Sequence, residues 1–168
     1  IDKNIVNKII SLKNIKNQNI LEIGPGRGAL TEKILEKKPK TLTLIEKDLK
    51  LYEILKKKYQ DNNKVKLLNS DILKIDLEKI INIKSIIFGN FPYNISSQIL
   101  FQIFENKDQI TEVVGMFQKE VAERIACKNG KKRGVLSVLI QTYYNVEYCF
   151  SVEPEMFNPS PKVNSGVI

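Results

Sequence analysis

Residues Asn19–Thr31, which read Asn-Ile-Leu-Glu-Ile-Gly-Pro-Gly-Arg-Gly-Ala-Leu-Thr, decide the fold of this chain. An apolar run leads into three glycines at alternate positions, Gly24, Gly26 and Gly28, and helix-forming residues follow at once. This order predicts a strand, a tight glycine turn and a helix. Glycine is needed where the backbone takes a positive φ or where a ligand approaches the main chain, and a helix start offers unpaired N–H groups. The stretch therefore predicts a nucleotide-type binding turn, although a strand-turn-helix without a ligand would share the pattern.

An acidic residue follows the next predicted strand. Residues 41–45 are apolar or β-branched, and Glu46 comes directly after them, about 20 positions beyond the glycine turn. An acid at the tip of the second strand can hold a ribose diol. The alternative is a solvated charge at a strand end, beside Lys47. We expect Glu46 and Lys47 to belong to a cofactor site.

The glycines alone do not identify the nucleotide, because residues 24–29 also satisfy the G-x-G-x-x-G/A pattern of NAD-binding turns. Glu22 lies close to where a pyrophosphate would sit, and a carboxylate there would repel a phosphate. S-adenosylmethionine (SAM) has no phosphate, and its amino and sulfonium groups are cationic. The pattern of Glu22, Gly24, Pro25 and Gly26 therefore favours SAM, unless the Glu22 side chain points away from the turn.

The composition is that of a globular protein with excess positive charge. The chain has 168 residues, of which 42% are hydrophobic and 27% charged, and its net charge is +8. This length predicts one domain. The charge is typical of nucleic-acid-binding proteins, although a compositional bias toward Lys, Ile and Asn would also produce it. No apolar run has the length of a membrane span, and Cys127 and Cys149 show no metal-ligand spacing. The absence of histidine excludes His-based triads and HExxH zinc sites.

Two more predicted strands end in polar residues. Asp71 closes the strand predicted at 65–68, where it can accept a hydrogen bond from an adenine amino group while Ile72 covers the ring. An Asp that only caps the next turn is the alternative. The very apolar run at 85–88 predicts a central strand. It leads into Asn90-Phe91-Pro92-Tyr93.

The segment Asn90-Phe91-Pro92-Tyr93 supplies an amide acceptor, a carbonyl before a proline and an aromatic face. Such a set can hold a planar base and accept hydrogen bonds from an exocyclic amine. The alternative is a proline turn with a buried tyrosine. Its place at a strand end favours the functional interpretation, because ligands of open α/β sheets bind beyond the carboxyl ends of the strands.

The rest of the chain alternates between helical and strand patterns. Helices are expected at 1–12, 49–59, 76–81, 97–106, 118–127 and 135–141, and further strands at 112–117, 143–152 and 163–168. A basic loop at 128–133 is either a phosphate contact or a solvated turn. The alternation predicts an α/β fold with a doubly wound, mostly parallel sheet. In that fold the glycine turn, Glu46, Asp71 and Asn90 would line one crevice.

These motifs resemble the SAM-dependent rRNA adenine N6-dimethyltransferases, most closely the KsgA type. The likeness spans nearly the whole chain and rests on Glu22–Gly28, Glu46, Asp71 and Asn90–Ser96, together with the segments 118–124 and 157–165. The macrolide-resistance enzymes, which methylate large-subunit rRNA, share the SAM and Asn-x-Pro-Tyr motifs. The Phe-x-Pro-x-Pro-Lys-Val segment and the Gln-Lys-Glu-Val helix are closer to the KsgA type.

The resemblance implies a Rossmann-like class I SAM-dependent methyltransferase that dimethylates N6 of two adjacent adenosines near the 3′ end of small-subunit rRNA, in ribosome biogenesis. It implies a monomeric, cytoplasmic or organellar protein that acts on rRNA or a pre-30S-type particle, away from membranes. Residues 1–168 would be the catalytic domain, without the family's N-terminal segment and C-terminal helical domain. The alternatives are a large-subunit rRNA or DNA adenine methyltransferase, a non-catalytic nucleic-acid-binding relative and an NAD oxidoreductase.

The resemblance also assigns roles to individual residues. The SAM site would consist of residues around the strand ends: Glu22, Gly24, Pro25, Gly26, Glu46, Lys47, Asp71, Ile72 and Asn90. The target-base site would consist of Asn90, Phe91, Pro92, Tyr93 and Phe157. Asn90 and the Phe91 carbonyl would hold the target N6, and Tyr93 and Phe157 would sandwich the flipped base. No metal is implied.

Overall fold

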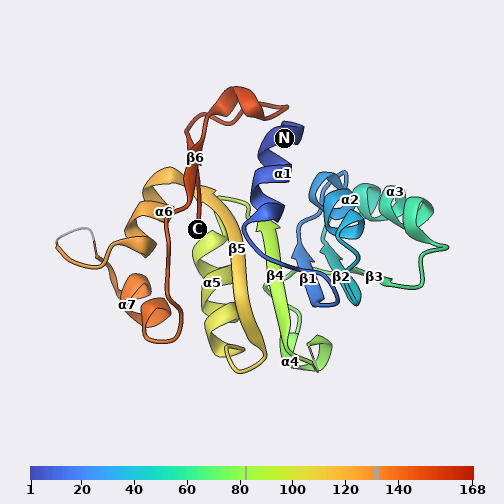
Figure 1. The fold of residues 1–168 in the computed structure, drawn as a ribbon, viewed down its shortest axis with the longest axis horizontal. Helices are drawn as coiled ribbons and strands as arrows, with labels where there is room; N and C mark the ends of the chain where they lie inside the picture. Colours follow the sequence, from blue (N-terminus) through green and yellow to red (C-terminus); the bar gives the residue numbers. More distant parts are fainter. Residues whose placement is uncertain (82, 131–132) are drawn as a thin grey trace.

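The computed structural model describes residues 1–81, 83–130 and 133–168 (Figure 1). Its strands are β1 (Asn19–Ile23), β2 (Thr41–Glu46), β3 (Val65–Asn69), β4 (Ser85–Asn90), β5 (Ile110–Gln118), β6 (Phe150–Val152) and β7 (Ser165–Val167). Its helices are α1 (Lys3–Ser11), α2 (Ala29–Glu36), α3 (Leu49–Tyr59), α4 (Leu77–Ile80), α5 (Ser96–Glu105), α6 (Lys119–Ala126) and α7 (Val135–Gln141), with a 3-10 turn, η1 (Pro154–Met156). Lys131 and Lys132 of the expected basic loop lie outside the described residues.

The strands form one sheet in the order β3-β2-β1-β4-β5-β7-β6. The first five strands in that order are parallel, whereas β7 runs antiparallel to both β5 and β6. The chain winds outward in one direction from β1 and in the other from β4, so the strand order switches between these two central strands. The predicted doubly wound, mostly parallel sheet is confirmed, with β4 at its centre.

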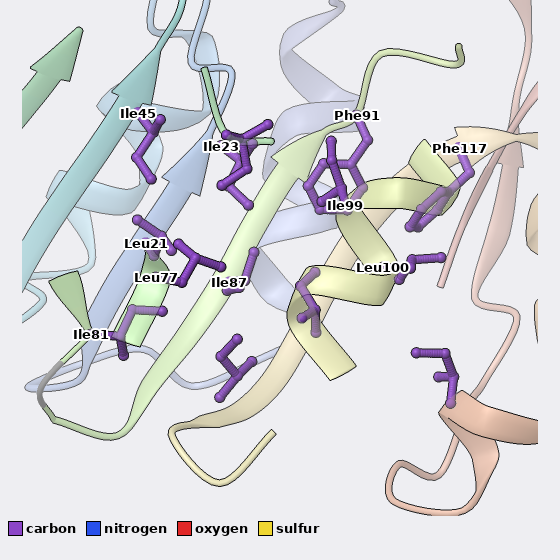
Figure 2. Packing of buried hydrophobic residues seen from close by; sticks show 14 of the residues in the cluster. Leu21, Ile23, Ile45, Leu77, Ile81, Ile87, Phe91, Ile99, Leu100 and Phe117 are labelled. Atoms are coloured by element: carbon purple, nitrogen blue, oxygen red, sulfur yellow. The ribbon is translucent and has the colours of Figure 1, made fainter. Parts of the chain in front are cut away.

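Helices cover both faces of this sheet because its central strands are apolar on both sides. Leu21, Ile23 and Ile87 pack with α4, α5, α6 and α7 on one face, where Figure 2 shows Leu77 of α4 close to Ile87. Their neighbours Ile20 and Ile86 belong to a second cluster with α1, α2 and Tyr59 of α3. The strands thus alternate between two cores with a period of two residues.

The strand predicted at 143–152 is largely wrong, since only β6 forms there. Tyr144, Val146 and Tyr148 alternate because their side chains pack against the core, not because the segment pairs with a neighbouring strand. The Tyr144 hydroxyl donates a hydrogen bond to the Ile110 carbonyl (2.9 Å). Side-chain burial therefore produced a strand-like pattern in an irregular segment.

Candidate active site

The glycine turn between β1 and α2 has the backbone that its sequence requires. Gly24, Gly26 and Gly28 all have positive φ, at 68°, 59° and 85°. A Cβ added at Gly24 or Gly26 would meet no atom within 4 Å, so open space lies beside the turn. The Gly24 N–H donates to the Ile45 carbonyl (2.9 Å), which ties the turn to the end of β2. The turn therefore leaves room for a ligand to approach its main chain.

Glu46 braces this turn from the end of β2. Its carboxylate is buried and accepts hydrogen bonds from the Gly26 N–H (3.0 Å) and the Asp48 N–H (2.9 Å), one on each oxygen. The Asn69 side-chain amide donates to the Glu46 carbonyl (2.9 Å) and so aligns the end of β3 with β2. A carboxylate offers about four acceptor positions. Glu46 therefore keeps acceptor capacity for a ribose diol beside the turn.

Glu22 is buried below the turn, with only 1% of its surface exposed. The Thr31 hydroxyl of α2 donates to one carboxyl oxygen (2.7 Å), and the other oxygen, Oε1, has no partner. Burial raises the pKa of Glu22 to about 8, against the lowering effect of the Thr31 hydrogen bond and with a further increase from the Glu46 charge. Near neutral pH the carboxyl is therefore mostly protonated. The electrostatic argument that Glu22 repels a pyrophosphate does not hold for an uncharged group.

Asp71 lies after β3 and pairs with Lys47, whose Nζ is 2.8 Å from its Oδ2. The Lys47 ammonium and the Leu73 N–H (3.1 Å) lower the pKa of Asp71. The Leu73 contact shows that Asp71 also caps its turn. The Lys47 side chain is 73% exposed, so it can move aside for another donor. Ile72 is 6% exposed in the core and offers only a small part of its surface to a ring.

At the end of β4, Asn90 has an unbonded side-chain amide, whereas the ring of the next residue, Phe91, is buried. Asn90 is half-buried, and its side chain makes no hydrogen bond within the part of the chain that the structure describes. Phe91 is buried against Phe117, with ring centroids 5.0 Å apart, and its N–H donates to the Met116 carbonyl (3.1 Å). Pro92 is exposed. Asn90 therefore stands on a rigid strand end with its amide free for a ligand.

Tyr93 is anchored by a residue that the sequence analysis gave no role. Its hydroxyl and the buried Ser165 hydroxyl of β7 are 2.6 Å apart. The Ser96 hydroxyl at the start of α5 donates to the Tyr93 carbonyl (3.2 Å). Ser165 belongs to the motif at 157–165, but only the pairing of β7 with β5 brings it to Tyr93. This anchor fixes the direction of the Tyr93 ring.

Phe157 packs away from Tyr93, against a different part of the core. It follows η1, is half-buried, and packs against the cluster formed by α1 and α2. The Asp2 N–H donates to the Met156 carbonyl (2.7 Å), so the start of α1 holds this segment in place. No ring contact joins Phe157 to Tyr93 among the described residues. The base sandwich stays a prediction.

Within the described ranges, no group of acidic, Cys or His side chains could hold a metal ion, and no helix is long and apolar enough to cross a membrane. The candidate site lies at the carboxyl ends of β1 to β4, where ligands of open α/β sheets bind. It offers backbone N–H groups, carboxyl groups and the unbonded Asn90 amide. Such a site can orient a polar cofactor and an amine.

Solved structures share this arrangement. The crystal structure of the 23S rRNA methyltransferase ErmE matches with a TM-score of 0.86 and 24% identity over 99% of this chain and 66% of that chain. That of a dimethyladenosine transferase from Plasmodium falciparum matches with a TM-score of 0.82 and 30% identity over 98% of this chain and 59% of that chain. The fold is the Rossmann-like fold of class I SAM-dependent methyltransferases, as predicted.

The family follows from the sequence. The model of the ribosomal RNA adenine dimethylases matches residues 1–168, and the chain belongs to this family. A relative from Fusobacterium nucleatum, named ribosomal RNA small subunit methyltransferase A, is 45% identical over 165 residues. The match covers 98% of this chain and 62% of the relative, so the chain spans about three fifths of that protein's length.

Proposed function

We propose that residues 1–168 form the catalytic domain of a SAM-dependent rRNA adenine N6-dimethyltransferase that acts on small-subunit rRNA. Family membership and the relative from Fusobacterium nucleatum support this reaction and substrate. The observation that carries the proposal is the unbonded Asn90 amide, which ends β4 at the same edge as the glycine turn and Glu46. The protein would act as a monomer on rRNA or a pre-30S-type particle, in the cytoplasm or in an organelle.

The residues at the strand ends fit SAM. The open space beside Gly24 and Gly26 suits its methionine end, with the buried Pro25 between them holding the turn. Glu22 offers the free oxygen Oε1 below that turn. Glu46 would hold the ribose. The adenine ring would then lie toward the end of β3, at a subsite formed by Asp71, Ile72 and Lys47. SAM would supply the methyl group, bound to a cationic sulfur.

The target amine needs help because the N6 lone pair of adenine is delocalised into the ring. The Asn90 side-chain oxygen and the Phe91 carbonyl would accept its two hydrogens and favour a tetrahedral nitrogen. N6 would then attack the methyl carbon in line as the carbon–sulfur bond breaks, and the extra proton would leave N6 for solvent. Positioning supplies most of the acceleration in such a step. No strong base is required, in accord with a chain without histidine.

The target adenine has to leave its stack before it can enter this site. Aromatic stacking on Tyr93 and Phe157 would recover roughly 1–3 kcal/mol per contact. The Ser165 anchor of Tyr93 makes its ring a fixed platform. Exposed Pro92 would border the base.

A methylation assay on two RNAs tests the proposal. Labelled SAM is supplied with unmethylated small-subunit particles and, separately, with large-subunit RNA, and the products are digested to nucleosides. We expect dimethyladenosine from the small-subunit particles alone. Label in large-subunit RNA would support the second candidate, an enzyme of the resistance type, whose SAM and Asn-x-Pro-Tyr motifs resemble those of this chain. Measurable SAM binding without label in either RNA would support a non-catalytic relative.

Removing the anchor of Tyr93 should weaken base binding without removing the ring. We expect Tyr93→Phe and Ser165→Ala each to lower the free energy of unfolding by about 1 kcal/mol, the net contribution of one hydrogen bond. Each should also raise KM for RNA several-fold. Steady-state kinetics and thermal unfolding measure both effects. The double variant should lose no more than either single one, and additive losses would contradict the anchoring role.

A further inference from the structure

We infer that the amino-terminal edge of the sheet, opposite the candidate active site, is a second contact for the phosphate backbone of folded RNA; this rests on the proposed function. An exposed lysine directly precedes each of three strands: Lys40 before β2, Lys64 before β3 and Lys84 before β4. Because these strands are parallel, their starts lie at one edge, with adjacent strands about 4.8 Å apart. The three lysines therefore form a row of positive charges along this edge of the sheet.

Hydrogen bonds hold the starts of these strands together. The Lys40 N–H donates to the Gln18 carbonyl (2.8 Å), and Lys64 Nζ donates to the Pro39 carbonyl (3.4 Å). The Asn19 side-chain amide donates to the carbonyl of the lysine before β4 (3.3 Å). Further exposed lysines come from the same segments: Lys16, Lys38 and Lys66. We call all six the lysine edge.

The lysine edge lacks compensating acids. None of its six ammonium groups forms an ion pair within residues 1–81, 83–130 and 133–168, whereas Lys33, Lys47, Lys58 and Lys79 each pair with a carboxylate. The nearest acid along the chain is Glu36, two residues before Lys38, and it pairs with Lys33 instead. The next is the exposed Asp61, in the turn before β3. Like charges at strand spacing repel one another. A polyanion that binds across the edge would relieve this repulsion.

A hollow at the same edge offers neutral donors as well as cations. It has a volume of about 250 Å³ between the starts of β1 to β4. Its polar lining comes from the following side chains: Asn19, Thr41, Thr43, Asn63, Lys64, Lys66 and Ser85. Ammonium, hydroxyl and amide groups are the groups that contact phosphate oxygens in nucleic-acid complexes. The chemistry suits an RNA backbone, without selection of a base.

The length of the strands separates the two edges. Strands of five to six residues, such as β1 and β4, span about 17–20 Å. An unpaired adenosine bound at the active site therefore lies too far from the lysine edge to contact it. Another part of the same folded RNA would bind there. The lysine edge would select a large, folded substrate, while a short RNA that carries the target adenosines would not use it.

The double variant Lys40→Gln/Lys64→Gln tests this. We expect its affinity for unmethylated small-subunit particles to fall about ten-fold near 0.1 M salt, and the slope of log K against log salt to decrease by about 1.4–1.8. Methylation of a short RNA that carries the target adenosines should be unchanged. The matched control, Lys56→Gln/Lys57→Gln on α3, removes the same charge from exposed positions and should bind particles like the wild type.

Equal losses in the two variants would show that diffuse charge is responsible, and an unchanged lysine-edge variant would show that this edge has no role. Either result overturns the inference while wild-type methylation stands. Absence of methylation by the wild type contradicts the proposed function instead. Thermal unfolding checks that the variants fold, and Lys84→Gln gives an independent test, with an expected decrease in slope of about 0.7–0.9.

Discussion

Asn90→Ala should abolish methyl transfer and leave SAM binding nearly intact. The variant removes the side-chain acceptor for the target amine, and loss of one such transition-state contact costs roughly 10²–10³-fold in kcat. The Asn90 side chain makes no hydrogen bond within the described chain, so its removal leaves no protein group unpaired. Stability should change by less than about 1 kcal/mol. Single-turnover methylation, calorimetric SAM binding and thermal unfolding measure the three quantities.

The sequence assigns Asn90 to both the cofactor site and the target-base site. Separate measurements of SAM binding and of methyl transfer distinguish these two roles. Asn94→Ala, at an exposed position of the same turn, is the matched control and should retain activity. If Asn90→Ala weakened SAM binding as much as it slowed transfer, the residue would act through the cofactor. Transfer at the wild-type rate would exclude it from the reaction altogether.

The glycine turn and the sheet could be predicted because their signals are local. Three glycines in five residues permit positive φ at little steric cost, and the structure has it at all three. The contact of Tyr93 with Ser165 depends on β7 pairing with β5, and no spacing in the sequence encodes a pair 72 residues apart. Residues 143–149 show the opposite case, in which burial against the core imitates a strand pattern.

The charge of Glu22 depends on tertiary structure, which the sequence around it does not reveal. A glutamate near a ligand turn is expected to be ionised, and its sequence position says nothing of the Thr31 hydroxyl that contacts it or of the burial that removes water. These features are known only once α2 is placed over β1. They change the predicted behaviour of the site from a fixed charge to a proton-binding group.

Glu22→Gln should therefore flatten the dependence of stability on pH. The pKa of Glu22 is about 8 in the folded protein, whereas a solvated glutamate has a pKa of 4.5, so the folded state binds the proton more tightly. Its contribution to stability is full below about pH 4.5, declines as pH rises and is lost above about pH 8. A shift of this size corresponds to roughly 4–5 kcal/mol. Relative to the wild type, the variant should gain roughly 10 °C in Tm at pH 8 and much less at pH 5.

Thermal unfolding across this pH range measures the effect, and Glu53→Gln, at an exposed position of α3, is the control that should follow the wild type. Parallel pH profiles for wild type and Glu22→Gln would contradict the buried proton. The same variant tests the cofactor site. A cationic ligand near Oε1 favours the ionised carboxyl, so SAM should bind the wild type more tightly at pH 8 than at pH 6. Glu22→Gln should lose this preference for pH 8, because its amide has no proton to release, and any remaining pH dependence would come from the amino group of SAM.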